Sequence, residues 1–171
     1  MTRIFFVVFF LVAAFSVQDA RSQSWIVGGN TGLSITDGAA GFHIGPMAEY
    51  LLNKTSSVGT DFSINTQSGT PLIWWTFYRY RFAVSGSKVK PYVDGGPLLT
   101  FVSGGPYFGL MFGGGVDIPV AKNLSVAPEF QGGPVFGVGG STTTFLGQTM
   151  KTEGRTIFAM ALRAAVHYQI P

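Results

Sequence analysis

Few residues of this 171-residue sequence could act in catalysis or bind a metal. There are two histidines, His43 and His167, and no cysteine. Neither histidine belongs to a cluster with metal-ligand spacing, and the glycine runs at 113–115 and 132–133 lack the lysine and following helix of a phosphate-binding loop. The sequence therefore predicts no enzyme, no metal and no cofactor, and we interpret both histidines as polar side chains satisfied by their neighbours.

A second set of residues is defined by charge. Because unpaired charges inside a narrow interior are costly, we expect charged residues that lie within apolar segments to form an internal network of salt bridges. The alternative is that they line a narrow, mildly cation-preferring pore. The predicted lumen network consists of Glu49, Asp61, Arg79, Arg81, Asp94, Asp117, Glu129 and Arg163.

Two members of this set, Arg79 and Arg81, are close neighbours of like charge. In a strand they would point the same way, about 7 Å apart. Such a pair repels unless carboxylates lie between or opposite the two side chains. Asp61 and Asp94 belong to the segments expected to flank the arginine segment. We predict that both arginines pair with carboxylates of the set, and we favour Asp61 or Asp94 as partners.

The elements that must position these charges are short strands. Turn signals occur at residues 37–38, 53–55, 67–69, 85–87, 103–106 and 121–123, and a polar stretch covers 139–156. The eight segments between them have roughly 10 to 14 residues, and a transmembrane strand needs about 9–11. Helical spacing is absent, and glycine and proline inside the segments would break helices.

Each segment has one face without charge. A strand places alternate side chains on opposite faces, so its residues divide by parity. In residues 72–84, for example, Arg79 and Arg81 share one face, whereas Trp74 and Tyr78 lie on the other. A lipid-facing Arg or Lys near the membrane midplane costs about 2–4 kcal/mol. The pattern therefore predicts that the charges point inward and the apolar face contacts lipid.

The composition agrees with this interpretation. Apolar residues make up 46% of the chain and charged residues 11%, whereas a typical soluble domain has about 25% charged residues. In hydrocarbon, only a closed barrel satisfies every backbone group of a set of strands. We predict an all-β fold, an eight-stranded antiparallel up-and-down transmembrane β-barrel, with a secreted soluble β-barrel that binds an apolar ligand as the alternative. The net charge of +3, without any run of Lys and Arg, argues against a nucleic-acid partner.

The first residues are typical of a secretory signal peptide. Arg3 precedes the apolar run at 4–15, and a polar stretch follows at 16–24. About a dozen apolar residues are too few to span a ~30 Å hydrocarbon core. We therefore expect residues 1–22 to be a signal peptide for the Sec route, with cleavage after Ser16 or Ala20 as alternatives, and residues 23–171 to form the barrel.

Three stretches carry a resemblance to a known family. They are 90–96 (KPYVDGG), 112–126 (FGGGVDIPVAKNLSV) and Glu129-Phe130. The sequence resembles the outer-membrane β-barrel domain family, whose small members include the OmpA barrel domain and OmpX. This resemblance implies a barrel in a Gram-negative outer membrane, in contact with lipid and with the barrel-assembly machinery, and no particular activity. The chain ends Ile170-Pro171, where such proteins usually end in an aromatic residue.

The length of the connections predicts the orientation. Barrels of this type have short periplasmic turns and longer external loops. The short turns at 53–55, 85–88 and 121–123 would then be periplasmic, and residues 139–155 would form a mobile external loop able to bind an extracellular ligand. We expect a monomer with a structural or surface-interaction role and a filled lumen, or alternatively a small porin-like channel.

Overall fold

The computed structural model describes residues 24–66, 71–102, 105–145 and 148–170, with the backbone alone for 141–152. The expected signal peptide, residues 1–22, and the expected turn at 67–69 lie outside the described residues. Within those ranges, no helix has the length and apolar character needed to cross a membrane.

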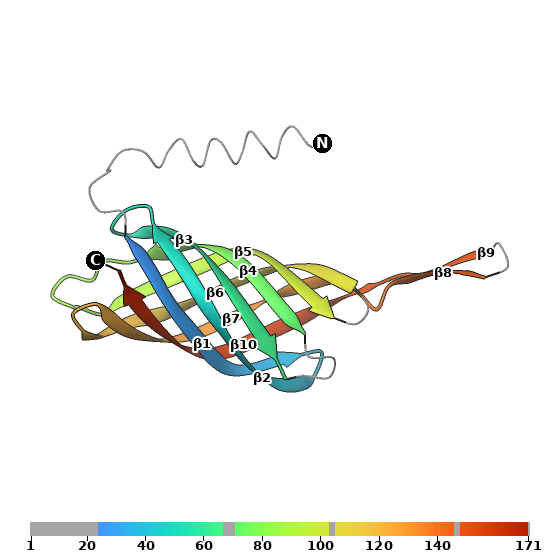
Figure 1. Cartoon of the computed structure of the whole chain (residues 1–171), viewed down its shortest axis with the longest axis horizontal. Coiled ribbons are helices and arrows are strands. Elements are labelled where there is room, and N and C mark those ends of the chain that lie inside the picture. The colour runs from blue at the N-terminus through green and yellow to red at the C-terminus, as the bar shows by residue number, and fades with distance from the viewer. Residues whose placement is uncertain (1–23, 67–70, 103–104, 146–147, 171) are drawn as a thin grey trace.

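Eight antiparallel strands close into a barrel in the order β1-β10-β7-β6-β5-β4-β3-β2 (Figure 1). Closure is made by β1, which pairs with β10 on one side and with β2 on the other. The predicted eight-stranded antiparallel barrel is confirmed. The strands are β1 (Trp25–Thr36), β2 (Ala39–Leu51), β3 (Ser56–Asn65), β4 (Leu72–Arg81), β5 (Lys90–Val102), β6 (Gly105–Ala121), β7 (Leu124–Val138) and β10 (Arg155–Gln169).

A two-stranded hairpin, β8 (Ser141–Phe145) and β9 (Gln148–Thr152), extends from the barrel between β7 and β10 (Figure 1). The sequence predicts a mobile external loop at 139–155, and the described part of this stretch is a regular two-stranded hairpin. Its threonines are β-branched and favour strands, and cross-strand pairing satisfies backbone groups that a loop would leave to water. The chain turns out of the barrel wall at Gly137 and Gly139, whose φ angles of 76° and 78° favour glycine.

The predicted alternation of faces is confirmed by burial. In β4, the side chains of Trp75, Phe77, Arg79 and Arg81 are buried, and the residues between them are largely exposed. The same pattern turns the charged face of the other charged strands inward, except for Lys90 and Arg155 at the strand starts, which are exposed. All eight charged residues of the predicted set are buried. The charged side chains therefore lie inside the barrel, and apolar side chains cover its outer face.

The turns fix where each strand begins. Asp37 and Gly38 join β1 to β2 with φ angles of 52° and 78°, as in a two-residue hairpin turn. The Asn53 side chain accepts hydrogen bonds from the backbone N–H groups of Thr55 and Ser56 at 2.9 and 2.8 Å. The start of β1 and the end of β10 lie at the same end of the barrel, which we call the terminal end. The turn at 53–55 also lies at this end. The β8–β9 hairpin projects from the opposite end, the hairpin end (Figure 1).

A cluster of apolar side chains packs in the interior near the hairpin end. Trp75 and Phe77 of β4 lie with ring centroids 4.7 Å apart. Leu98 and Met111, from the next two strands around the barrel, complete this cluster with Met47 and Val135. The charged residues occupy the remaining length of the interior, toward the terminal end.

Candidate functional site

Strand register alone creates two of the interior ion pairs. Arg79 of β4 lies directly opposite Asp94 of β5, and Arg163 of β10 lies directly opposite Glu129 of β7. The guanidinium of Arg79 donates from Nε and Nη2 to Asp94 Oδ2 at 3.0 and 2.8 Å. Nε of Arg163 donates to Glu129 Oε2 at 2.8 Å. Facing side chains on paired strands are close enough for such contacts.

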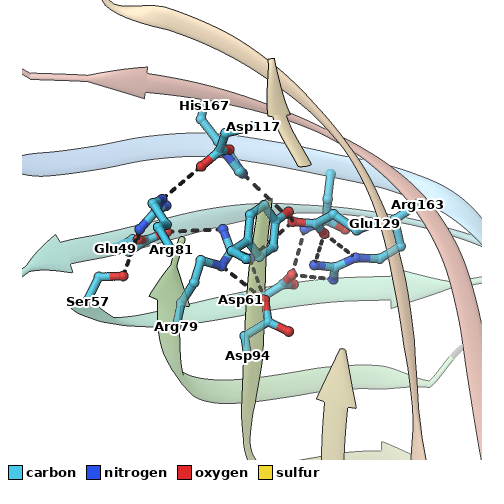
Figure 2. Close-up of polar contacts among 12 residues, drawn as sticks. Glu49, Ser57, Asp61, Arg79, Arg81, Asp94, Asp117, Glu129, Arg163 and His167 are labelled. Carbon is cyan, nitrogen blue, oxygen red and sulfur yellow. Dashed lines mark hydrogen bonds and ion pairs between the residues drawn. The ribbon is translucent and has the colours of Figure 1, made fainter. Parts of the chain in front are cut away.

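Arg79 also joins strands that do not touch. Its Nη1 lies 3.2 Å from Glu49 Oε2 on β2, and its Nη2 lies 3.1 Å from Glu129 Oε1 on β7. Both Arg79 and Glu49 have 0% exposure. Figure 2 shows Arg79 among these carboxylates, which converge on it from different sides of the barrel. The interior at this level is therefore filled by charged groups.

Arg81 forms a second junction, one step nearer the terminal end. Its Nε donates to Asp117 Oδ2 at 2.8 Å, and its Nη1 binds Glu49 and donates to Ser57 Oγ at 2.9 Å. Glu49 thus lies between the two arginines and accepts from both. A shared carboxylate offsets the repulsion between these like charges, as the sequence argument required.

The ion-pair partner of Asp61 differs from the one predicted from the sequence. Its partner is Arg163 on β10, with Nη1 and Oδ2 2.7 Å apart, and Asn30 of β1 donates to the same carboxylate oxygen at 2.7 Å. The preference for Asp61 as a partner of Arg79 or Arg81 is wrong. The cause is register: Arg79 faces Ser57, so Asp61 lies four residues further along β3, about 13 Å away at ~3.3 Å per residue. Asp94, the other favoured partner, does bind Arg79.

Tyr92 is a member of the network that the sequence argument missed. Its hydroxyl donates to Glu129 Oε1, and its ring centroid lies 4.1 Å from the Arg79 guanidinium carbon. A buried tyrosine supplies both an aromatic face for a cation and a hydrogen-bond donor. The available signal was parity, because Tyr92 lies two residues before Asp94 and so shares its inward face.

Glycines on β6 make room for these side chains. A Cβ atom at Gly115 would lie 2.6 Å from the Tyr92 hydroxyl oxygen and 2.6 Å from the Pro128 carbonyl oxygen. At Gly113 it would lie 2.9 Å from Asp94 Oδ1. Glycine at both positions therefore leaves space for the network.

The two histidines lie on opposite sides of the network. The Nδ1 of His167 lies 2.8 Å from Asp117 Oδ1, and His167 lines a cavity at the terminal end. His43 lines a small cavity at the hairpin end, with Asp61 and Arg163. Among the described residues, no group of three or more His, Cys, Asp or Glu could hold a metal ion.

The network separates these two cavities. The cavity at the terminal end measures about 520 Å³, and the one at the hairpin end about 50 Å³. Glu49, Arg79 and Glu129 line neither of them, and none is more than 2% exposed. All eight barrel strands contribute to the barrier, since Asn30 supplies the contact from β1. The arrangement can hold the barrel together through its centre and obstruct passage along its axis.

A closed eight-stranded barrel with an apolar outer face and an ion-paired interior has the architecture of the small outer-membrane β-barrel class. The crystal structure of Neisserial surface protein A is similar, with a TM-score of 0.61 at 16% identity over 90% of this chain and 100% of that chain. The N-terminal β-barrel domain of Pseudomonas aeruginosa OprF gives 0.58 at 11% identity, over 86% of this chain and 100% of that domain.

A third similar structure is the outer membrane protein AlkL, determined by solid-state NMR in DMPC lipid bilayers. It gives a TM-score of 0.51 at 11% identity over 90% of this chain and 96% of that chain. No protein-family model matches the sequence, and no curated protein matches it significantly. The likeness therefore concerns the fold, which is that of a small outer-membrane β-barrel.

Proposed function

We propose that this protein is an integral barrel of a Gram-negative-type outer membrane, with a closed lumen and a structural or surface-interaction role rather than an enzymatic one. The observation that carries the proposal is the outer face. Leu33, Phe112 and Leu162 are between 57% and 64% exposed, and they belong to a belt of exposed apolar side chains around the barrel. Soluble monomers rarely expose continuous apolar surface on this scale.

The burial of the charged side chains also supports a membrane environment. In water, a barrel gains stability by placing charges outside and apolar groups inside. Here the charged groups lie inside and apolar side chains cover the outside, which is favourable when the surrounding solvent is hydrocarbon. A soluble barrel with an apolar ligand inside is disfavoured, because Arg79, Glu49 and their partners occupy the interior. The similar structures support the proposal through their fold, and one of them was determined in lipid bilayers.

The proposed orientation has the terminal end in the periplasm and the β8–β9 hairpin outside. The turns at 53–55 and 121–123 are short, as periplasmic turns are, and the hairpin is the long connection. We further propose that residues 1–22 are removed as a signal peptide, that the chain acts as a monomer inserted by the barrel-assembly machinery, and that the hairpin end contacts an extracellular partner.

A narrow channel is the second candidate, and the two cavities favour it. They approach the network from opposite ends of the barrel, so movement of a few side chains would join them. Conductance in planar bilayers separates the two functions. A closed barrel gives no steady unitary current, whereas a channel gives one with the wild-type protein.

Fractionation tests the membrane location. The chain is expected to remain with outer membranes after a carbonate wash and to migrate differently on gels before and after heating in detergent. Release into the wash as a folded, monomeric protein would contradict the proposal. A soluble periplasmic protein followed in the same fractions provides the control.

A further inference from the structure

The cavity at the terminal end, which we call the vestibule, is lined by several lysines. Four of the five lysines of the sequence line this volume of about 520 Å³: Lys54, Lys88, Lys90 and Lys122. They come from three separate connections, namely the β2–β3 turn, the β4–β5 loop with the start of β5, and the β6–β7 turn. Strands distant in the sequence therefore bring these lysines around one opening.

The carboxylate that lines the vestibule is already occupied. Asp117 binds Arg81 and His167, each at 2.8 Å. Within the described ranges, none of the four vestibule lysines has a carboxylate within ion-pair distance. All four lysines are exposed at the mouth of the vestibule, and cationic side chains gathered around a concave surface create a positive potential. Among the described residues, the positive charge around the vestibule therefore exceeds the negative charge of its lining.

Arg81, which lines the vestibule, has one donor without a partner in the described part of the chain. Arg81 lines the vestibule and is 4% exposed, and its Nε and Nη1 are engaged by the network. Its Nη2 is buried without a hydrogen-bond partner among the described residues. Buried donors are normally paired, because desolvation without a partner costs free energy. An acceptor that enters the vestibule and reaches Nη2 would supply the missing partner.

We propose that the vestibule binds a small anion that carries phosphate groups, held by the four lysines and by Arg81. Lysine binds phosphate as a point charge, and a guanidinium donates to its oxygens. The volume lies within the ~300–1,000 Å³ of typical small-molecule sites. The phosphate groups could belong to a soluble compound or to a phospholipid headgroup. The inference does not depend on the proposed membrane role.

Calorimetry with pyrophosphate as the probe tests the site, using the full chain folded in a maltoside detergent that contains no phosphate. Replacing Lys54, Lys88, Lys90 or Lys122 by Gln should weaken binding by about two- to fivefold each, and replacing all four should abolish it. Lys151→Gln is the matched control, because Lys151 is the one lysine that lies on β9, beyond the opposite end of the barrel. The affinity of the Lys151→Gln variant for pyrophosphate should equal that of the wild type.

Two results would overturn the proposal: no binding of pyrophosphate to the wild type, or equal weakening by Lys151→Gln and the vestibule variants. Heat-dependent gel migration of each variant verifies that the barrel is folded. Adding phosphatidylglycerol to the micelles distinguishes the sources of the phosphate group. Displacement of pyrophosphate assigns the site to a lipid headgroup, and unchanged binding assigns it to a soluble phosphate compound.

Discussion

Asp61 of β3 and Arg163 of β10 form an ion pair with Oδ2 and Nη1 2.7 Å apart, although two strands separate them around the barrel wall. Both side chains are buried. The contact crosses the interior and joins the first half of the chain to its last strand. Because β10 also closes the barrel against β1, this pair lies on one of the two strands that close the barrel.

The Asp61–Arg163 pair should therefore show strong coupling. Asp61→Ala leaves a buried arginine with fewer partners and should lower the free energy of unfolding in detergent by roughly 3–5 kcal/mol. The double change Asp61→Leu with Arg163→Met should cost clearly less than the sum of the single changes. Arg155→Ala, which breaks an exposed ion pair with Asp37, serves as control and should cost about 1 kcal/mol or less. Small, additive effects at Asp61 and Arg163 would contradict a stabilising network.

Removal of the Tyr92 hydroxyl tests the residue that joins Arg79 to Glu129. Tyr92→Phe keeps the ring over the guanidinium and deletes only the hydrogen bond to the carboxylate. We expect a loss of about 1.5–3 kcal/mol in unfolding free energy, as for a hydrogen bond to a charged group. Tyr168→Phe, on the exposed face of β10, should change stability far less. Equal losses would show that the Tyr92 hydroxyl has no special role.

The space left by Gly115 is a third target. Gly115→Ala would bring a methyl group against the Tyr92 ring and the Pro128 carbonyl, so overpacking should cost about 1–3 kcal/mol. Gly132→Ala is the milder control, since its nearest neighbour is a Phe158 ring carbon at 3.3 Å. Thermal unfolding of both variants in the same detergent gives the comparison. A Gly115→Ala protein as stable as the wild type would refute the steric argument.

Charge on the outer face should impair membrane insertion. Leu162 is 64% exposed on β10, and Leu162→Arg should cost about 2–4 kcal/mol if that face contacts lipid near the midplane. Glu153→Arg adds an arginine at an exposed site beside the hairpin and should insert normally. Equal insertion of both variants into vesicles would argue against the membrane location.

Proteolysis of intact cells tests the orientation. Trypsin should cut first after Lys151 on β9 and after Arg155 at the start of β10, because the hairpin end is proposed to lie outside the cell. The Arg155 side chain is 67% exposed, which fits a cleavable site. Protection of both sites in intact cells, followed by cleavage after lysis, would require the opposite orientation.

The sequence by itself determined the faces of the strands and the strand count. A strand alternates its side chains with a period of two, so one charged residue in a segment identifies the inward face of all its neighbours. The same rule places Arg79 and Arg81 on one side of β4. It also places Asp94 inward on the next strand, and a hairpin register then brings Asp94 opposite Arg79. These relationships involve one strand or two neighbouring strands, so the local sequence pattern is enough to predict them.

Only the tertiary structure decided which charges meet across the interior. Contacts such as Glu49 with both arginines, or Asp61 with Arg163, depend on how far each strand is staggered along the barrel axis when β1 and β10 close the sheet. A shift of two residues keeps every face unchanged but exchanges the partners across the lumen. The vestibule arises in the same way, because closure is what gathers lysines from three separate turns around one opening.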